Sequence, residues 1–240
     1  MPGIIFDFDD TLVHTTDRFD RIRRQFCGLL RDWGYDLPGI EHIVDGFDIR
    51  NIKQSGYFAA HCFPRALLQT YKHCCRVFNH PICPVKSDQI EEMGWSVFRE
   101  PPLPCATAHD LLQELRASYP LVLLTKGDYE VQKKRIEQSG LAHYFCETFI
   151  VPNKDSTAFQ KISEYLGIAP ARSWAIGNSV KSDINPALRA GFRAVLVKAN
   201  NWIYEDAEAI GTYYQVDVLN EIREIILNPL SFPKIIEHES

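Results

Sequence analysis

Two carboxylates stand at the end of a short apolar run near the amino terminus. Residues 4–6 are apolar and lead into Asp7, Phe8, Asp9, Asp10 and Thr11. Carboxylates two residues apart at the carboxyl end of a strand place one side chain to attack and the next to move a proton, while a backbone carbonyl between them can help hold a cation. The same pattern occurs in calcium loops and in plain strand-to-turn transitions, so these residues alone leave both interpretations open.

A second segment, residues 121–128, carries an apolar run that ends in Thr125 and turns through Gly127. A hydroxyl, free backbone N–H groups and the positive end of a helix dipole would converge at this turn, and together they can hold a phosphate. A threonine in this position can equally be an ordinary helix cap.

Two further segments end in polar residues. Lys154 follows the run at 145–151 and could give a compact positive charge to a phosphoryl group, although a lysine in such a loop is usually solvated. Asp183 follows the run at 174–176 and could either begin a helix or act beside Asp7 as an oxygen donor for Mg2+. If all four segments end strands of one parallel sheet, their polar residues meet at the edge where such folds bind ligands.

The order of elements after residue 120 predicts such a sheet. Apolar strands alternate with amphipathic helices; the strands are expected at 121–124, 145–151, 174–176 and 194–197, and the helices at 128–139, 155–166 and 182–190. Strict alternation implies an α/β fold with a doubly wound, Rossmann-like parallel sheet.

Residues 14–104 follow a different pattern. Apolar stripes with helical spacing at 19–33 and 67–78 predict helices of a separate bundle, in which the stripes are core packing. The Pro-rich stretch 101–104 would be a stiff return linker. We therefore expect an all-helical domain at 14–104, inserted into an α/β core formed by 1–13 and 105–240.

Composition narrows the classes of protein. The chain has 240 residues, of which 45% are hydrophobic and 24% charged, with no apolar run long enough to span a bilayer. The net charge of −5 argues against general nucleic-acid binding. Seven cysteines without paired spacing, and an amino terminus without a signal pattern, lead us to expect a cytoplasmic protein. His and Cys residues between 61 and 83 lack a Cys-x-x-Cys pair, which favours buried helix faces over a zinc site.

The four segments in order are Asp-x-Asp-x-Thr, a strand-terminal Thr, a Lys, and Gly-Asn-Ser-x-x-Ser-Asp. Together they resemble the haloacid dehalogenase-like (HAD) hydrolase superfamily over residues 1–13 and about 105–220. The insert at 14–104 resembles the helical cap that many members carry. The resemblance implies a Mg2+-dependent phosphatase that hydrolyses a small-molecule phosphomonoester through an aspartyl-phosphate. Asp9 favours the phosphatase branch, because dehalogenating members lack this second acidic residue.

The resemblance also implies a role for each site residue. Asp7 would be the nucleophile, and Asp9 the acid that protonates the leaving oxygen and the base that activates water. The transferring phosphoryl group would be held by Thr125, Lys126 and Lys154, and the Mg2+ by Asp7, Asp9 (through its backbone carbonyl) and Asp183. Asn178 stands where many relatives have Asp, so we expect it to be a weak or indirect metal ligand.

Other functions stay open at this point. The aspartyl-phosphate could pass to a second substrate, as in a phosphotransferase or mutase, or the fold could serve a catalytically weak binding protein, for which Asn178 is the only encouragement. A nucleic-acid-binding module is the weakest option. We expect a small phosphorylated metabolite as partner, with no nucleic acid or membrane. The oligomeric state is open, because Trp202, Ile203 and Tyr204 could form an interface or pack against the core.

Overall fold

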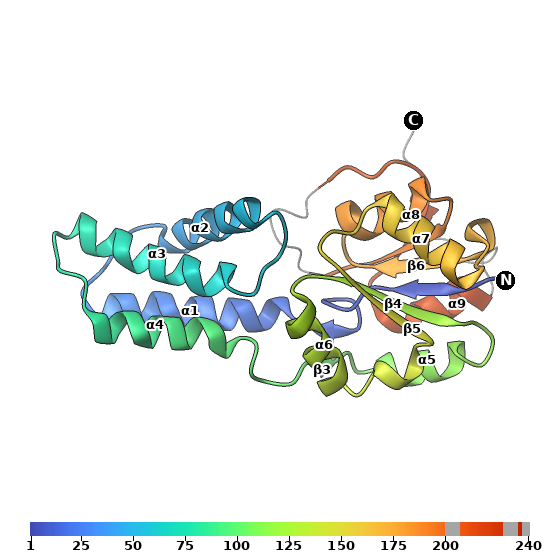
Figure 1. The fold of residues 1–240 in the computed structure, drawn as a ribbon, viewed down its shortest axis with the longest axis horizontal. Helices are drawn as coiled ribbons and strands as arrows, with labels where there is room; N and C mark the ends of the chain where they lie inside the picture. The colour runs from blue at the N-terminus through green and yellow to red at the C-terminus, as the bar shows by residue number, and fades with distance from the viewer. Residues whose placement is uncertain (200–206, 228–234, 237–240) are drawn as a thin grey trace. The chain divides into compact units, whose positions relative to one another are not determined.

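The computed structural model describes residues 1–199, 207–227 and 235–236 (Figure 1). The apolar residues Trp202, Ile203 and Tyr204 lie outside these ranges. The chain divides into two compact units, one formed by Met1–Thr16 and Pro102–Ser240 and the other by Asp17–Pro101. We call them the core unit and the helical unit, and describe each by itself.

Each join between the units lies three residues from the boundary expected from the sequence. Two short strands explain the difference: β2 (Val13–His14) pairs with β3 (Leu103–Pro104) in an antiparallel ribbon. His14, which was expected to begin the insert, and Leu103 and Pro104, which were expected to lie in the return linker, therefore belong to the core unit together with Val13.

In the described part of the chain, the core unit is built on a seven-stranded sheet in the order β5-β4-β1-β6-β7-β8-β9. Its strands are β1 (Ile4–Phe6), β4 (Leu121–Lys126), β5 (Glu147–Val151), β6 (Trp174–Gly177), β7 (Arg193–Val197), β8 (Tyr213–Val216) and β9 (Ile235–Ile236). The first six strands in this order pair in parallel, which confirms the predicted doubly wound sheet. The edge strand β9 is antiparallel to β8 and was not predicted.

Helices cover both faces of the sheet (Figure 1). They are α5 (Ala108–Leu115), α6 (Tyr129–Gln138), α7 (Ser156–Leu166), α8 (Asn185–Arg189) and α9 (Ile222–Leu227). Alternate residues of β1 face opposite layers, since Ile4 and Phe6 share a cluster with residues of α5, α6 and α9, whereas Ile5 shares one with residues of α7 and α8. Strand β1 is therefore buried from both sides, and its position in the sheet is fixed.

The helix predicted at 182–190 is wrong at its start. The chain forms a π-helical turn at Val180–Ile184 and then enters α8. Ser179 begins this turn, because its Oγ accepts a hydrogen bond from the Ser182 amide at 3.0 Å and its carbonyl accepts from the Ile184 amide five residues on at 3.1 Å. Asp183 therefore lies inside a wide turn rather than on a regular helix.

The helical unit consists of α1 (Thr16–Asp32), α2 (Ile40–Ser55), α3 (Cys62–Val77) and α4 (Pro84–Ser96). All four contribute to one apolar core, which includes Phe26, Val44, Leu67 and Ile90. The two predicted stripes fall on α1 and α3. Helices α2 and α4 were missed because neither carries a clean apolar stripe: the buried face of α2 contains two polar residues, and that of α4 contains Gly94.

Cys62, Cys74 and Cys75 are buried on α3, as expected for helical packing. None of the seven cysteines, all in described segments, forms a disulfide. In the part of the chain that the structure describes, no group of three His, Cys, Asp or Glu side chains is arranged to hold a metal, and no helix is long and apolar enough to cross a membrane.

Candidate active site

The predicted site segments meet at the carboxyl edge of the sheet. Asp7 follows β1, Thr125 lies near the end of β4, Lys154 follows β5, and Asp183 follows β6. Because β5, β4, β1 and β6 are parallel neighbours, their ends lie side by side. The Asp7 amide donates to the Ile176 carbonyl at 2.8 Å, which ties the start of the first loop to β6.

An ion-pair triad occupies the centre of this edge. Lys154 Nζ lies 2.5 Å from Asp7 Oδ1 and also contacts Asp183 Oδ1, and all three side chains are buried. Burial disfavours the charged lysine, but the two carboxylates outweigh it and raise the pKa of Lys154. Burial raises the pKa of Asp7 to about 7; Lys154 opposes this rise, while Asp183 and Asp9 add to it. Two carboxylates thus share one ammonium group, so negative charge is in excess at this site.

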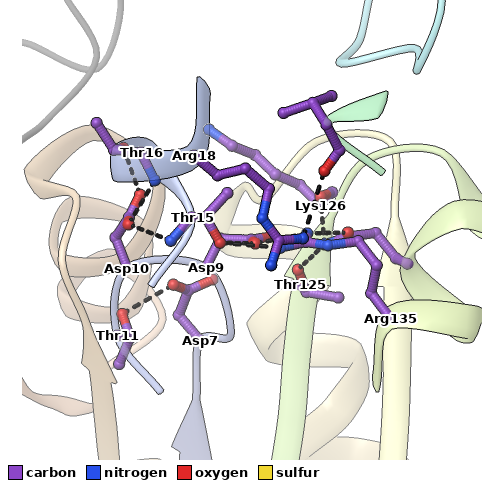
Figure 2. A network of polar contacts seen from close by, with 12 residues as sticks. Asp7, Asp9, Asp10, Thr11, Thr15, Thr16, Arg18, Thr125, Lys126 and Arg135 are labelled. Carbon is purple, nitrogen blue, oxygen red and sulfur yellow. Dashed lines mark hydrogen bonds and ion pairs between the residues drawn. The ribbon is translucent and has the colours of Figure 1, made fainter. Parts of the chain in front are cut away.

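Two further oxygen-bearing side chains, those of Thr11 and Asn178, lie next to this triad. Thr11 Oγ1 donates to Asp7 Oδ2 at 2.8 Å and lies 3.3 Å from Asn178 Oδ1, which places the Asn178 amide near the Asp7 carboxylate (Figure 2 draws the Thr11–Asp7 bond). The Ser179 amide donates to Asp183 Oδ2 at 3.0 Å. A Cβ at Gly177 would overlap the Asp183 carboxyl, so only glycine permits this packing.

These residues suit a hard cation. Mg2+ binds one or two carboxylates together with carbonyl oxygens and waters, and does not need three acidic side chains. Asp7 and Asp183 supply the carboxylates, Asn178 offers an amide oxygen, and the charge excess at Asp7 would be relieved by a cation. The donor set at this edge therefore fits the metal expected from the sequence.

Asp9 lies in a separate network (Figure 2). Its Oδ1 accepts from Thr15 Oγ1 at 2.6 Å and pairs with Arg135 Nη1 at 2.6 Å, while its Oδ2 accepts from Gln132 Nε2 at 2.7 Å. Burial raises the pKa of Asp9, but the charge of Arg135 and the three donors outweigh it, so the net pKa is lowered. Both oxygens of this carboxylate are held in place by these three side chains.

The same network reaches the predicted phosphate-binding threonine. Gln132 Nε2 donates to Thr125 Oγ1 at 2.8 Å, and Thr125 is 1% exposed. Lys126 Nζ donates to Ser182 Oγ at 2.7 Å. Since β1 lies between β4 and β6, this lysine side chain crosses the end of β1 and remains within the site region.

Asp10, the third carboxylate of the first loop, is a turn residue. Its Oδ1 accepts from the amides of Thr15 and Thr16, each at 2.9 Å, and its Oδ2 accepts from Thr16 Oγ1 at 2.6 Å. Its φ of 57° is in the left-handed region that aspartate tolerates in turns. Asp10 thus fixes the loop that carries Asp7 and Asp9.

Sequence reasoning missed Gln132, Arg135 and Thr15. Gln132 and Arg135 are three residues apart on α6, which is the spacing of one helix face, and they are only 4% and 6% exposed. Polar residues on a helix are ordinarily solvated. The one available signal in the sequence was that these polar residues occupy positions on the buried face of α6, where an apolar stripe should continue.

Comparisons with known proteins agree with the fold. A family model described as haloacid dehalogenase-like hydrolase matches residues 1–191. N-acylneuraminate-9-phosphatase from Homo sapiens is 26% identical over 233 residues, covering 93% of each chain. A haloacid dehalogenase-like hydrolase from Xanthomonas campestris has a similar structure, with a TM-score of 0.71 and 24% identity over 88% of this chain and 86% of its own.

Some structural neighbours carry out other chemistry. The L-2-haloacid dehalogenase from Xanthobacter autotrophicus gives a TM-score of 0.63 at 15% identity, over 95% of this chain and 99% of its own, which is a likeness of fold alone.

The match of the family model over residues 1–191 shows that this chain belongs to the haloacid dehalogenase-like hydrolase family. The phosphatases among its relatives favour phosphatase-type activity within that family.

Proposed function

We propose that this protein is a Mg2+-dependent phosphatase that hydrolyses a small phosphomonoester through a phosphorylated Asp7. The observation that carries the proposal is the pair of carboxylates after β1: Asp7 is joined to Lys154 and Thr11, and Asp9 is joined to a different set of donors. Two carboxylates with separate surroundings can take two separate roles, nucleophile and acid–base.

The reaction has two steps. In the first, a carboxylate oxygen of Asp7 forms a bond to phosphorus as the ester P–O bond breaks, and the leaving oxygen takes the electron pair and a proton from Asp9. In the second, a water attacks the phosphorus, Asp9 accepts the water proton, and the bond between Asp7 and phosphorus breaks to release phosphate. Asp9 is then protonated again. Despite burial, the charge of Arg135 lowers the pKa of Asp9 in the free enzyme, so the protonated form of Asp9 depends on the anionic phosphoryl group bound nearby, whose charge favours the neutral acid.

Positive charge and hydroxyl donors assist both steps. Lys154 would offset the repulsion between the Asp7 carboxylate and the anionic phosphoryl group, and Thr125 with Lys126 would contact the transferring group. Asp7, the backbone carbonyl of Asp9, Asp183 and, weakly or indirectly, Asn178 would hold Mg2+. When bound, the ion would supply charge stabilisation to the transferring phosphoryl group.

Asp9 separates this proposal from dehalogenation. A dehalogenase displaces halide, which leaves without a proton, so an acid at this position would have no leaving group to protonate. Here Asp9 is held by three polar side chains at the same edge as Asp7. That arrangement favours chemistry in which an alkoxide leaves and water must be activated.

We further propose that residues 14–104, most of which form the helical unit, serve as a cap that excludes water and selects the leaving group. The substrate would be a small phosphorylated metabolite, with neither nucleic acid nor membrane as partner. Seven unpaired cysteines suit a reducing compartment, so we place the protein in the cytoplasm.

The test is release of inorganic phosphate from a panel of small phosphomonoesters, with and without Mg2+, by the wild type and by Asp7→Asn. We expect release that depends on Mg2+ and disappears in the variant. Equal release by both proteins would contradict the role of Asp7. A second panel with candidate acceptor alcohols present separates hydrolysis from phosphoryl transfer, because a transferase releases phosphate only slowly without an acceptor. Binding without turnover would favour the catalytically weak protein.

A further inference from the structure

Two buried polar residues on α6 are devoted to the carboxylate that we assign as acid and base. Arg135 Nη1 pairs with Asp9 Oδ1 at 2.6 Å and lies 2.6 Å from Gln132 Oε1, while Arg135 Nη2 donates to Thr15 Oγ1 at 2.9 Å. Gln132 Nε2 in turn donates to Asp9 Oδ2 and to Thr125 Oγ1. These distances are short, and every residue of the network belongs to the core unit.

These interactions are difficult to explain as packing alone. A charged or amide side chain that is more than nine-tenths buried loses its hydration, and an apolar residue of similar size would fill the same space without that loss. Apart from the Lys126 carbonyl, which lies 3.3 Å from Gln132 Nε2, the polar atoms that the side chains of Gln132 and Arg135 contact belong to Asp9, Thr125, Thr15 and each other. The two residues are therefore satisfied by the site itself.

Arg135 is also fixed from another direction. Its guanidinium lies over the ring of Phe8 at 5.5 Å from the centroid, and Phe8 is the residue between the two carboxylates of the first loop. Phe8 is fully buried. The planar guanidinium is thus held against a rigid aromatic surface while its nitrogens face Asp9, an arrangement that a lysine could not reproduce.

We propose that Gln132 and Arg135 are positioning residues: they orient the Asp9 carboxylate for proton transfer and, through the amide of Gln132, tie it to the phosphate-binding hydroxyl of Thr125. The inference rests on the proposed function. Gln132 is the link between the two sides of the reaction, because one nitrogen contacts both the group that moves the proton and the group that holds the phosphoryl oxygen. A loss of this link misplaces Asp9 while the triad of Asp7, Lys154 and Asp183 stays intact.

Misplacing Asp9 has a specific kinetic consequence. Proton transfer by a positioned acid contributes about 10²- to 10⁴-fold to a rate, and only when the leaving oxygen needs the proton. The leaving oxygen of p-nitrophenyl phosphate needs little protonation, whereas that of phenyl phosphate needs more, and the two substrates have a similar shape. The ratio of kcat/KM for these two substrates therefore reports the placement of Asp9 during the first step.

The experiment compares wild type with Gln132→Met and Arg135→Lys, using kcat/KM on both substrates in the presence of Mg2+. Gln132→Met keeps the shape of the side chain and removes its donors; Arg135→Lys keeps the charge and removes the planar fork. The matched control is Gln138→Met, the same substitution at an exposed place on α6. We expect Gln132→Met to lower kcat/KM about 10²-fold on phenyl phosphate and less than about tenfold on p-nitrophenyl phosphate, with no change in the control.

A second readout follows the other half of the reaction. With p-nitrophenyl phosphate, Gln132→Met should show a burst of one nitrophenolate per enzyme, because Asp9 must also activate the water of the second step. Equal losses on the two substrates, or wild-type kinetics in both variants, would overturn the inference. If Gln132→Met fails to fold by circular dichroism, Arg135→Lys decides by the same ratio. A wild type that releases phosphate from no member of the phosphomonoester panel, these two substrates included, refutes the proposed function, and the inference with it; an active wild type with unselective losses refutes the inference alone.

Discussion

The helical unit buries an aspartate that makes its stability depend on pH. Asp48 lies on α2 and is 5% exposed, and its Oδ1 has no hydrogen-bond partner among the described residues. Burial raises its pKa from 3.8 to about 7; Arg23 on α1 opposes this rise and Asp45 on α2 adds to it. Arg23 cannot offset the burial fully, because its guanidinium already pairs with Asp20 at 2.5 Å and Asp45 at 3.2 Å.

The magnitude follows from this shift. A rise from 3.8 to about 7 is worth about 4 kcal/mol of preference for the neutral acid in the folded state. When an acid has a higher pKa in the folded state than in the unfolded state, its stabilising contribution is fully present at pH values below the unfolded pKa. This contribution is lost as the pH rises through the folded pKa. Between about pH 5 and about pH 8, Asp48 alone should lower the free energy of unfolding by about 3 kcal/mol.

The measurement is urea unfolding of wild type and Asp48→Asn, followed by circular dichroism at both pH values and constant ionic strength. The variant cannot ionise at this position, so its advantage over wild type should grow by about 3 kcal/mol from the lower to the higher pH. Asp88→Asn, at an exposed position on α4, is the matched control and should parallel the wild type. Parallel pH profiles for wild type and Asp48→Asn would refute the reasoning.

Three substitutions in the core unit have equally definite outcomes. Lys154→Met leaves Asp7 and Asp183 buried without the ammonium group that they share. In urea at neutral pH without added metal, the free energy of unfolding of this variant should be about 3–5 kcal/mol lower than that of the wild type. An unchanged free energy of unfolding would contradict the triad. Gly177→Ala should displace the Asp183 carboxyl, so phosphate release should need more Mg2+ for half-maximal activity; an unchanged Mg2+ titration would show that Asp183 is no ligand. Asp155→Ala removes the cap whose Oδ1 accepts from the Ala158 amide at 2.9 Å, and should destabilise the protein by about 1 kcal/mol in the same unfolding measurement; a stability equal to wild type would argue against the cap.

Much of the core unit could be predicted because its signals are local. Apolar strands such as 121–124 must be buried on both sides. Residues at strand ends, such as Asp7 and Thr125, come together because neighbouring parallel strands end at the same edge of the sheet. No long-range information was needed to bring these side chains to one edge. The fold and the family follow from the same four segments.

The remaining features depend on contacts that the sequence does not display. Gln132 and Arg135 look like solvated helix residues until Asp9 and Thr15, more than a hundred residues away, surround them. Helix α2 was missed because it buries Asp48 and Asn51, which break the apolar periodicity. The π-helical turn at Val180–Ile184 depends on a cap and a carbonyl from Ser179, so a regular helix was the wrong expectation there.

The central claim is that Asp7 carries the phosphoryl group, and mass spectrometry of the trapped enzyme tests it most directly. Asp9→Asn should slow the second step, so this variant, mixed with p-nitrophenyl phosphate and Mg2+ and quenched with acid, should accumulate the intermediate. We predict a burst of one nitrophenolate per enzyme and the added mass of one phosphoryl group on the peptide that contains Asp7. A burst with Asp7 unmodified, or a phosphoryl group on any other residue, would contradict the account.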